Sequence, residues 1–352
     1  MYIIFAIIAF GVLIAVHEVG HFSAAKALGV KVNEFAIGMG PKLLRKQGKE
    51  TLYTLRALPI GGFCAMEGEN ESSEDSRSFT AQKRWRRVVI LAAGGVANLI
   101  VCFVIIVVLV SGYDDFVGTT LTGLFDGFPN EGVHGLMAGD TLVSINGERL
   151  YYVDDVNLFL GLSKSGQVDL VIRRDGETIT LNKFPLEKRE YMLNGELQLK
   201  YGLQFNVIEA TAWGKLKYSC YTTMNYVRLI RVSLAQIFSG AAGVRDLSGP
   251  VGIVDAMNTI GQESTTVLAG IGNIVGFMAF IGVNLAVVNL LPIPAMDGGR
   301  ILFLFITWVI EKILRRHLDP KYEGYIHTTA LVLLMGLMVF ILVNDVVKIV
   351  RS

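Results

Sequence analysis

Four long apolar runs dominate the sequence and restrict the chain to architectures that cross a membrane. They cover residues 2 to 25, 88 to 110, 267 to 291 and 326 to 347. A helix of roughly 20 apolar residues, at about 1.5 Å per residue, spans the hydrocarbon core of a bilayer. The hydrophobic content of 52% is also too high for an ordinary soluble enzyme. We therefore predict a mainly α-helical membrane protein with four transmembrane helices.

Two other apolar stretches are not expected to span the membrane. The segment 218 to 238 is interrupted by Arg228 and Arg231 on one helical face, so it suits an amphipathic surface helix. The segment 301 to 310 is too short to span and fits a helix at the membrane interface. No Lys or Arg precedes the first run, so we expect a retained helix rather than a cleaved signal peptide.

Positive charge predicts the orientation of the four helices. Lys and Arg are concentrated between residues 26 and 87 and between 300 and 321, and such clusters mark cytoplasmic loops. Both termini are then extracytoplasmic, as is the region between the second and third helices. Lys348 and Arg351 on the external tail argue weakly against this orientation, but the internal clusters are larger. A net charge of +1 gives no reason to expect a nucleic-acid partner.

The end of the first run carries His17-Glu18-Val19-Gly20-His21. On a helix, His17 and His21 share one face, so both imidazoles can reach one zinc ion. Glu18 projects beside them, where its carboxylate can take a proton from a water activated by the metal. Ionisable groups are costly at membrane depth and indicate function by default. The alternative is a membrane anchor with incidental polar residues.

A catalytic zinc site needs a third protein ligand, and Asp297 is the best candidate. The run 267 to 291 points inward like the first run, so Asp297 arrives at the depth of His17 and His21. A fifth span at 218 to 238 would place Asp297 on the opposite side of the membrane. The other candidates lie in a strand-like segment or far from any suitably spaced partner: Glu34, Glu50, His134, His317 and His327.

The residues around Asp297 fit a role in a site. Pro292 and Pro294 break the preceding helix, and Gly298-Gly299 permit close approach of the backbone. The alternative is a plain helix N-cap, because an aspartate before Gly-Gly-Arg and an apolar run suits that position. In combination with the two histidines, the role of metal ligand is favoured.

Residues 31 to 66 alternate and contain several glycines, which predicts a β-hairpin or small sheet with residues 42 to 50 as its polar turn. Backbone outside helices is tolerated at membrane depth where protein covers it or where it faces a water-filled cavity. A soluble cytoplasmic hairpin is the alternative. The acidic residues 67 to 77 are expected to form a flexible loop.

Residues 113 to 207 have a soluble composition, and Asn146-Gly147 and Asp175-Gly176 predict hairpin turns. The run from 135 to 148 resembles part of a PDZ domain of the kind found in bacterial proteases. Such a domain can bind peptide termini by strand addition, or it can act as a size filter over an active site. The sequence leaves both open. Residues 208 to 266 are expected to form amphipathic extracytoplasmic helices.

Four motifs occur together in the chain: His17-Glu18-Val19-Gly20-His21, Gly94-Gly95-Val96-Ala97-Asn98, Pro59-Ile60-Gly61-Gly62-Phe63 and Asn289-x-x-Pro292-x-Pro294-x-x-Asp297-Gly298. The first and the last of them lie far apart in the sequence. With them the chain resembles the site-2 protease family of intramembrane zinc metalloproteases. The family usually has Leu where Met296 stands and Pro where Gly95 stands. Neither departure touches a predicted ligand, and Met for Leu conserves volume.

The resemblance implies a zinc-dependent endopeptidase that cleaves transmembrane segments of single-span membrane proteins, with its active site toward the cytoplasm. It implies substrate contacts for Asn289, for Pro292 and Pro294, and for a re-entrant hairpin that includes Gly38 and Gly40. Family members with a PDZ insertion act in the bacterial cytoplasmic membrane as the second protease of regulated intramembrane proteolysis. Their substrates are anti-sigma factors or signal-peptide remnants.

Two other functions compete with a protease. The first is a catalytically inactive PDZ scaffold tethered to the membrane, but such a protein is expected to lose Glu18 or a metal ligand, and all are present. The second is a transporter that uses intramembrane polar residues. A transporter is expected to show internal repeats at matching positions, and the sequence has none that we detect.

Overall fold

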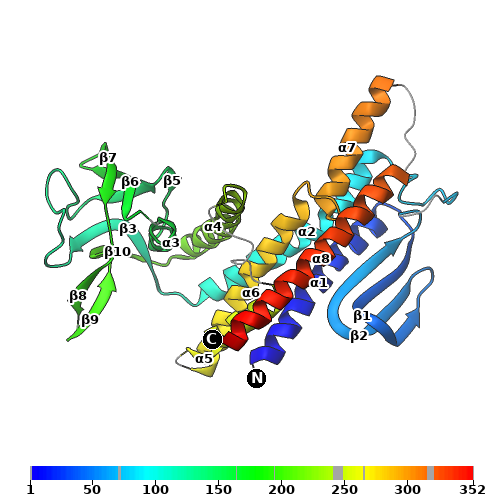
Figure 1. Cartoon of the computed structure of the whole chain (residues 1–352), viewed down its shortest axis with the longest axis horizontal. Coiled ribbons are helices and arrows are strands. Elements are labelled where there is room, and N and C mark those ends of the chain that lie inside the picture. Colours follow the sequence, from blue (N-terminus) through cyan, green and yellow to red (C-terminus); the bar gives the residue numbers. More distant parts are fainter. Residues whose placement is uncertain are drawn as a thin grey trace. The chain divides into compact units, whose positions relative to one another are not determined.

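The computed structural model divides the chain into two compact units, which Figure 1 draws in sequence colours. The first unit joins Met1–Leu109 to Thr222–Ser352, and the second is Val110–Tyr221. The described residues are 2 to 69, 73 to 163, 165 to 193, 195 to 240, 249 to 264, 266 to 314 and 321 to 351. Expectations about residues 70 to 72 of the acidic loop and 315 to 320 of the second basic cluster lie outside them.

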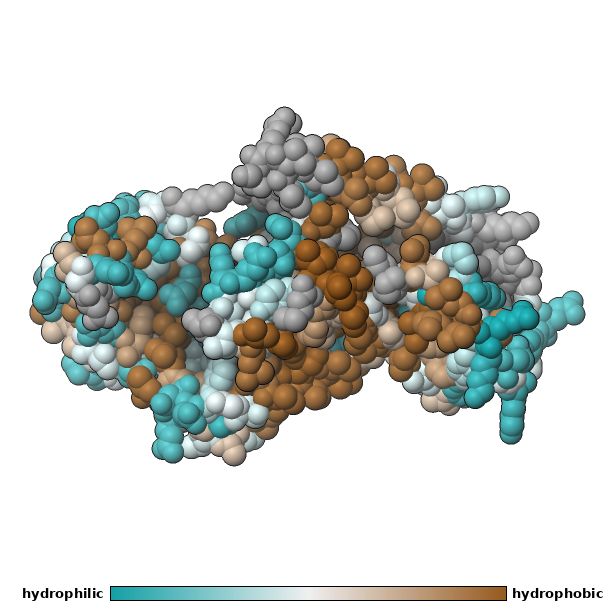
Figure 2. Space-filling model, turned by 90° about the horizontal axis from the view of Figure 1, so that it is seen from below, coloured by the Kyte–Doolittle hydropathy of each residue, from teal (hydrophilic) through white to brown (hydrophobic). Residues whose placement is uncertain are grey.

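Four helices of the described residues are long and apolar enough to cross a membrane: α1 (Tyr2–Ala27), α2 (Arg84–Ser111), α6 (Val267–Leu290) and α8 (Lys321–Arg351, with its apolar part at Gly324–Asp345). Leu13 of α1 is fully buried, whereas Ile4 is 67% exposed, so one face packs into the protein and the other is left for lipid. Figure 2 shows apolar side chains spread over much of the helical surface. The predicted mainly helical fold with four spans is confirmed.

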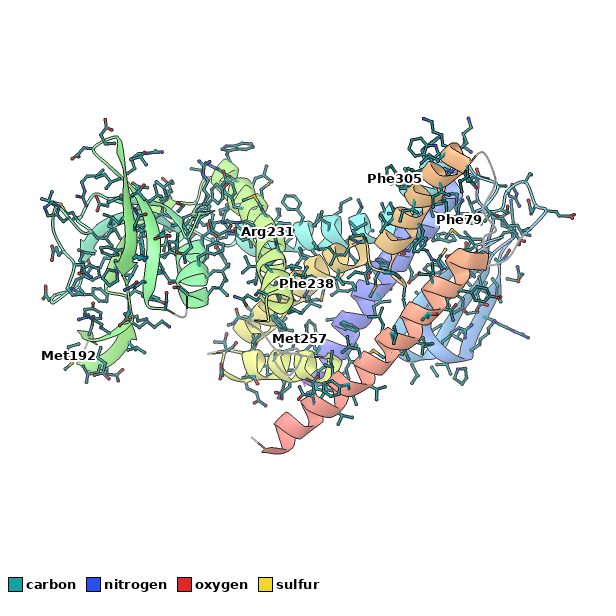
Figure 3. The ribbon with its side chains drawn as sticks, turned by 45° about the horizontal axis from the view of Figure 1, so that its top comes forward. Phe79, Met192, Arg231, Phe238, Met257 and Phe305 are labelled. Atoms are coloured by element: carbon teal, nitrogen blue, oxygen red, sulfur yellow. The ribbon has the colours of Figure 1, made fainter. Side chains whose placement is uncertain are left out.

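Three more helices belong wholly or partly to the first unit: α4 (Ala212–Phe238), α5 (Pro250–Gln262) and α7 (Asp297–Leu314). α4 is not among the helices apolar enough to span, as expected for the amphipathic segment 218 to 238. α7 contains the predicted interfacial stretch but begins earlier, at Asp297. Figure 3 labels Phe305 on its surface, and this side chain is 59% exposed.

Helix α5 connects α8 to the rest of the first unit. Its Met257, labelled in Figure 3, is fully buried. The backbone N–H groups of Gly249 and Gly252 both donate to one carboxylate oxygen of Asp345, at 2.9 Å. Asp345, on α8, is 2% exposed. A carboxylate that accepts N–H groups at the start of a helix stabilises that end, so α8 caps α5 from a distant part of the chain.

The predicted hairpin is present as β1 (Val32–Gln47) and β2 (Leu52–Met66), but its turn is shorter than expected. Residues 42 to 47 are not part of a polar turn: they continue β1 and pair with 52 to 56. Their polar composition suggested a turn, but the backbone pairing and the hydrogen bond from Lys42 to Glu34 keep them extended.

Each strand of the hairpin bends and supplies two segments to the sheet. Residues 34 to 37 pair with 62 to 65 on one side and with 52 to 55 on the other. The bends carry Gly38 and Gly61, at φ +84° and +90°, a backbone conformation that glycine adopts without steric cost. A side chain at Gly38 would also lie 2.5 Å from the carbonyl oxygen of Leu58.

The hairpin has one packed face and one exposed apolar region. Its buried side chains join α1, α2 and α7 in a common core: Ala25, Val30, Val32, Phe35, Cys64, Met66, Phe79, Ile90, Leu91 and Leu304. Near the bends, Leu43, Leu44 and Leu58 are 63%, 67% and 57% exposed. Large apolar side chains exposed together indicate contact with lipid or with another chain.

The second unit is built around a sheet in the order β10-β3-β4-β6-β7, with β5 paired to β4 and a separate β8–β9 hairpin. Its elements are β3 (Asp115–Leu124), β4 (Thr141–Ile145), β5 (Glu148–Arg149), α3 (Val153–Leu162), β6 (Gln167–Arg174), β7 (Glu177–Pro185), β8 (Arg189–Leu193), β9 (Glu196–Lys200) and β10 (Leu203–Glu209). The two predicted turns occur, with φ +50° at Asn146 and Asp175. The predicted domain 113 to 207 lies inside this unit.

Candidate metal centre

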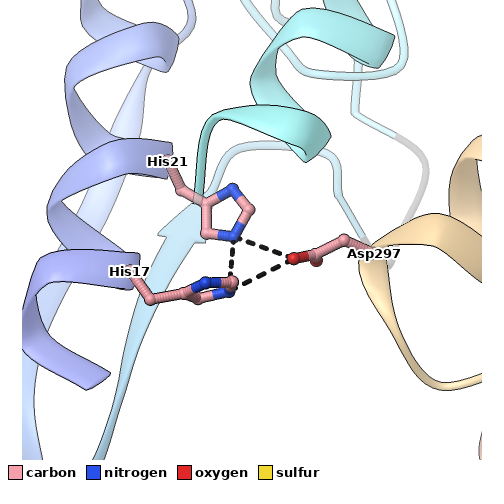
Figure 4. A group of neighbouring side chains, drawn as sticks. All are labelled: His17, His21 and Asp297. Carbon is pink, nitrogen blue, oxygen red and sulfur yellow. Dashed lines mark hydrogen bonds and ion pairs between the residues drawn. The ribbon is translucent and has the colours of Figure 1, made fainter. Parts of the chain in front are cut away.

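Three predicted ligands from opposite ends of the chain meet in the first unit (Figure 4). Nε2 of His17 lies 3.1 Å from Nε2 of His21, and Oδ2 of Asp297 lies 3.2 Å and 3.3 Å from these two atoms. Tetrahedral zinc with bonds of about 2.0–2.1 Å requires ligand atoms about 3.3–3.4 Å apart. The spacing and the chemistry of these donors therefore fit zinc.

The two histidines lie on the buried face of α1, with exposed fractions of 8% and 7%. Nδ1 of His21 is 2.8 Å from the carbonyl oxygen of Ile90 on α2, and only a protonated Nδ1 can donate to that oxygen. Nε2 then keeps its lone pair for a metal. Metal-binding histidines are commonly oriented through their second nitrogen in this way.

A glycine on α2 makes room for the metal-binding atoms. A Cβ added at Gly94 would lie 2.4 Å from Nε2 of His21 and 2.8 Å from Nε2 of His17. The two helices are also close at Gly20, where a Cβ would lie 2.4 Å from the carbonyl oxygen of Ala93. Small residues allow such close contact between membrane helices. The sequence contained Gly94 within a motif, but nothing in it indicated that this glycine faces both imidazoles.

Asp297 is held by a tight turn between α6 and α7. Ala295 has φ +74°, which is strained for a residue with a side chain. A Cβ at Gly298 would lie 2.3 Å from the carbonyl oxygen of Leu290, and one at Gly299 would lie 2.1 Å from that of Ile293. Both glycines are therefore required for the turn, as their position after Asp297 suggested.

The carboxylate of Asp297 suits a metal ligand. Its Oδ2 faces Nε2 of both histidines, so the carboxylate can bind the same cation as the two imidazoles. Asp297 is also the first residue of α7, so the ligand and helix-terminus roles coincide.

Glu18 and Asn289 lie beside the three ligands. The carboxylate of Glu18 is within electrostatic range of His17, His21 and Asp297. It also borders β2, because a Cβ at Gly62 would lie 3.1 Å from Cγ of Glu18. Nδ2 of Asn289 is 3.5 Å from both ring nitrogens of His17, so it lies next to the ring without aligning with either lone pair. Glu18 is thus placed between the ligands and the hairpin.

The other predicted site residues lie at two turns. Gly38 and Gly40 are at a bend of the hairpin, both with φ +84°. Pro292 and Pro294 are in the turn before Asp297, where Pro292 is exposed and Pro294 half-buried. The structure therefore brings Glu18 and Asn289 to the ligands and leaves these four in the segments that frame them.

The model of peptidase family M50 matches residues 5–337. The chain belongs to peptidase family M50. This is the site-2 protease family that its motifs resemble, so the predicted family and the predicted class of enzyme, a zinc metallopeptidase, are confirmed.

Several bacterial relatives named for an inferred zinc metalloprotease activity match the M50 chain over nearly its full length. The chain is 37% identical over 349 residues to one from Clostridium perfringens, covering 99% of both proteins. It is 37% identical over 347 residues to one from Clostridium acetobutylicum, covering 98% of this chain and 97% of the relative. A Synechocystis protein is 32% identical over 354 residues, covering 97% and 93%.

Proposed function

We propose that this protein is an intramembrane zinc endopeptidase that hydrolyses peptide bonds in the transmembrane segments of single-span membrane proteins. The observation that carries the proposal is the group of His17, His21 and Asp297, with Glu18 beside it, at the end of a helix apolar enough to span a membrane. Ligands and a base at that position have no structural use in an anchor, because buried ionisable groups are costly in a bilayer.

Each residue of the centre has a proposed role. His17, His21 and Asp297 hold Zn²⁺, which when bound supplies a Lewis acid that polarises a carbonyl and lowers the pKa of water. Glu18 accepts the proton of the attacking water and returns it to the nitrogen of the leaving amine. The Ile90 carbonyl keeps His21 in the tautomer that binds the metal.

The hairpin is proposed to hold the substrate in an extended form. A helical peptide has no accessible carbonyl, so the substrate must unwind and then needs new partners for its backbone in an apolar setting. One edge segment of the sheet, residues 62 to 65, passes Glu18 at Gly62. Strand addition there would satisfy the substrate backbone with little demand on its sequence. Helix-breaking residues in the substrate are expected to favour cleavage.

The remaining predicted contacts frame this path. Asn289, next to His17, is proposed to hydrogen-bond the substrate backbone near the metal. Gly38 and Gly40 set the bend of the hairpin, and Pro292 and Pro294 set the turn that carries Asp297. The exposed leucines near the bends are proposed to contact lipid, which would make the hairpin re-entrant rather than soluble.

The charge pattern supports an orientation with both termini extracytoplasmic and the metal centre toward the cytoplasm. The bacterial relatives support a bacterial cytoplasmic membrane as its location. The unit Val110–Tyr221 would then be extracytoplasmic and is proposed to be a PDZ domain that contacts peptides or the soluble part of substrates. We propose that the enzyme makes the second cut in regulated intramembrane proteolysis, with anti-sigma factors or signal-peptide remnants as substrates.

The test uses the full-length protein in detergent with a model single-span substrate. Cleavage by the wild type should be lost in Glu18→Gln and after chelation, and zinc should restore the chelated enzyme. An exposed change in the second unit, Glu177→Gln, is the matched control and should cleave normally. Undiminished cleavage by Glu18→Gln would refute the proposal. Zinc binding without cleavage of any single-span substrate would favour the scaffold instead.

A further inference from the structure

An ion pair links the end of the hairpin to the helix that carries the third ligand. Glu69 follows β2, and one of its carboxylate oxygens accepts the N–H of Met66 at 3.3 Å. The other oxygen pairs with Nη1 of Arg300. Arg300 lies in the first turn of α7, three residues after Asp297, so the two share a face of the helix. The side chains of Glu69 and Arg300 are 15% and 29% exposed.

Both ends of this connection lie next to the metal centre. Glu69 is within electrostatic range of Glu18, and the strand before it borders Glu18 at Gly62. Backbone packing at Gly298 and Gly299 fixes the distance of α7 from the preceding turn, but it places no side-chain connection toward the hairpin. Leu304 of α7 shares the apolar core with the hairpin, and Arg300 adds an ionic connection in the first turn of the helix. Removing one charge of a largely shielded pair is costly, because the remaining charge loses that interaction.

We propose that Glu69 and Arg300 are positioning residues that hold Asp297 in a fixed position relative to the β1–β2 hairpin. The proposal rests on the proposed function of this site. The pair acts through the first turn of α7 and through the end of β2. It sets the orientation of the Asp297 carboxylate toward the two imidazoles and the distance of the hairpin edge from the reacting atoms.

The same helix offers a matched control. Glu311, in the last turns of α7, pairs with Arg84 at the start of α2. Glu311 is 14 residues beyond Asp297, which is about 21 Å along a helix at about 1.5 Å per residue. This second pair also attaches α7 to the protein. It should therefore report the effect of loosening α7 without disturbing its first turn.

The experiment compares Glu69→Gln, Arg300→Gln, the double variant and the exchanged pair Glu69→Arg with Arg300→Glu. Zinc affinity is measured by competition with a chelator, and the visible spectrum of the cobalt-substituted protein reports ligand geometry. Each single variant should weaken zinc binding about tenfold, the lower end of what residues that orient ligands cost. The double variant should be no worse than either single one, and the exchanged pair should recover most of the affinity.

Cleavage kinetics provide a second readout. Because the hairpin still binds substrate, kcat should fall in the single variants while KM changes by less than about twofold, as expected when alignment is lost. Arg84→Gln and Glu311→Gln should leave zinc affinity, the cobalt spectrum and kcat unchanged. Equal losses in the control pair would overturn the proposal, as would single variants with wild-type zinc affinity and kcat.

The exchanged pair keeps the proposal testable if a single variant fails to fold. An exchanged pair that folds but binds zinc as poorly as a single variant would also overturn it. Failure of the proposed function would look different: the wild type would bind zinc with its normal cobalt spectrum and cleave nothing. The metal-binding measurements would then still decide the role of the pair.

Discussion

Asp140 of the second unit and Asp297 of the first unit have surroundings that differ in kind. Asp140 of the second unit is fully buried and receives three donors: Nε and Nη2 of Arg174, both at 2.7 Å, and the N–H of Met137 at 2.8 Å. Asp297 of the first unit instead faces the Nε2 atoms of His17 and His21. Because His21 uses Nδ1 as its donor, its Nε2 is an acceptor.

The partners of the two carboxylates therefore separate a structural acid from a functional one. Three donors point to the carboxylate of Asp140, so Arg174 balances its charge and both of its oxygens are hydrogen-bonded. At Asp297 the carboxylate and the Nε2 lone pair of His21 face one another, an arrangement that a cation stabilises. Substitution of the two aspartates should therefore have opposite consequences for metal binding and for stability.

The largest expected effect comes from exchanging each aspartate for asparagine. Asp297→Asn should weaken zinc binding by more than about 100-fold and abolish cleavage, since residues that merely orient ligands already cost about 10–100-fold. Asp140→Asn should leave zinc affinity unchanged but destabilise the second unit by about 3 kcal/mol, because Arg174 loses its anionic partner. Chelator competition and denaturant unfolding of the second unit measure the two outcomes. The comparison breaks down if Asp297→Asn retains zinc.

A smaller effect is expected from a residue that is no ligand at all. Gly94→Ala should lower zinc affinity about tenfold or more, because the added methyl group would occupy the space beside both Nε2 atoms. Gly272→Ala is the matched control: this glycine is also in a spanning helix, and a Cβ there meets nothing within 4 Å. The control should bind zinc normally. Normal zinc binding by both variants would mean that α2 can move away from the histidines.

The sequence predicted the parts of the centre that depend on local spacing or on membrane depth. His17 and His21 are four residues apart on one helix, which fixes their common face before any tertiary structure is known. Asp297 was predicted because two inward-running spans end at the same depth, and it does meet the histidines. Glu18 followed from its place between them.

The parts that could not be predicted depend on contacts between distant backbone segments. The Ile90 carbonyl that orients His21 has no side-chain signature, and Gly94 matters only because α2 crosses α1 at that point. The extended segment 42 to 47 has the polar composition of a turn, and only its pairing with 52 to 56 shows otherwise. Glu69 lies in a stretch that was expected to be flexible, yet it pairs with Arg300.

The smallest expected effect concerns a third carboxylate, Glu67. Like Asp140, it accepts hydrogen bonds from several donors, but it lies near the surface. It accepts hydrogen bonds from Ser73 at 2.7 Å, Asn33 at 2.9 Å and Lys31 at 3.3 Å. These donors, Ser73 most of all, lower the pKa of Glu67 from 4.5 to about 2. A pKa lowered by folding stabilises the folded loop above the unfolded pKa, and this contribution is lost as the pH falls toward the folded pKa.

Glu67→Gln should therefore lower the protection of the loop from hydrogen exchange at neutral pH. In acid, the wild type and the variant should be equally protected. The N–H of Phe79 donates to the backbone carbonyl of Glu67 at 2.7 Å, so its hydrogen exchange reports on the loop. The difference in protection between wild type and variant should be constant from pH 7 to 5, shrink below about 4.5 and vanish near 2, as the pKa values require. A difference that persists unchanged at pH 3 and below would show that packing, rather than the charge of Glu67, holds the loop. Glu67 would then differ from Asp140 in mechanism as well as in burial.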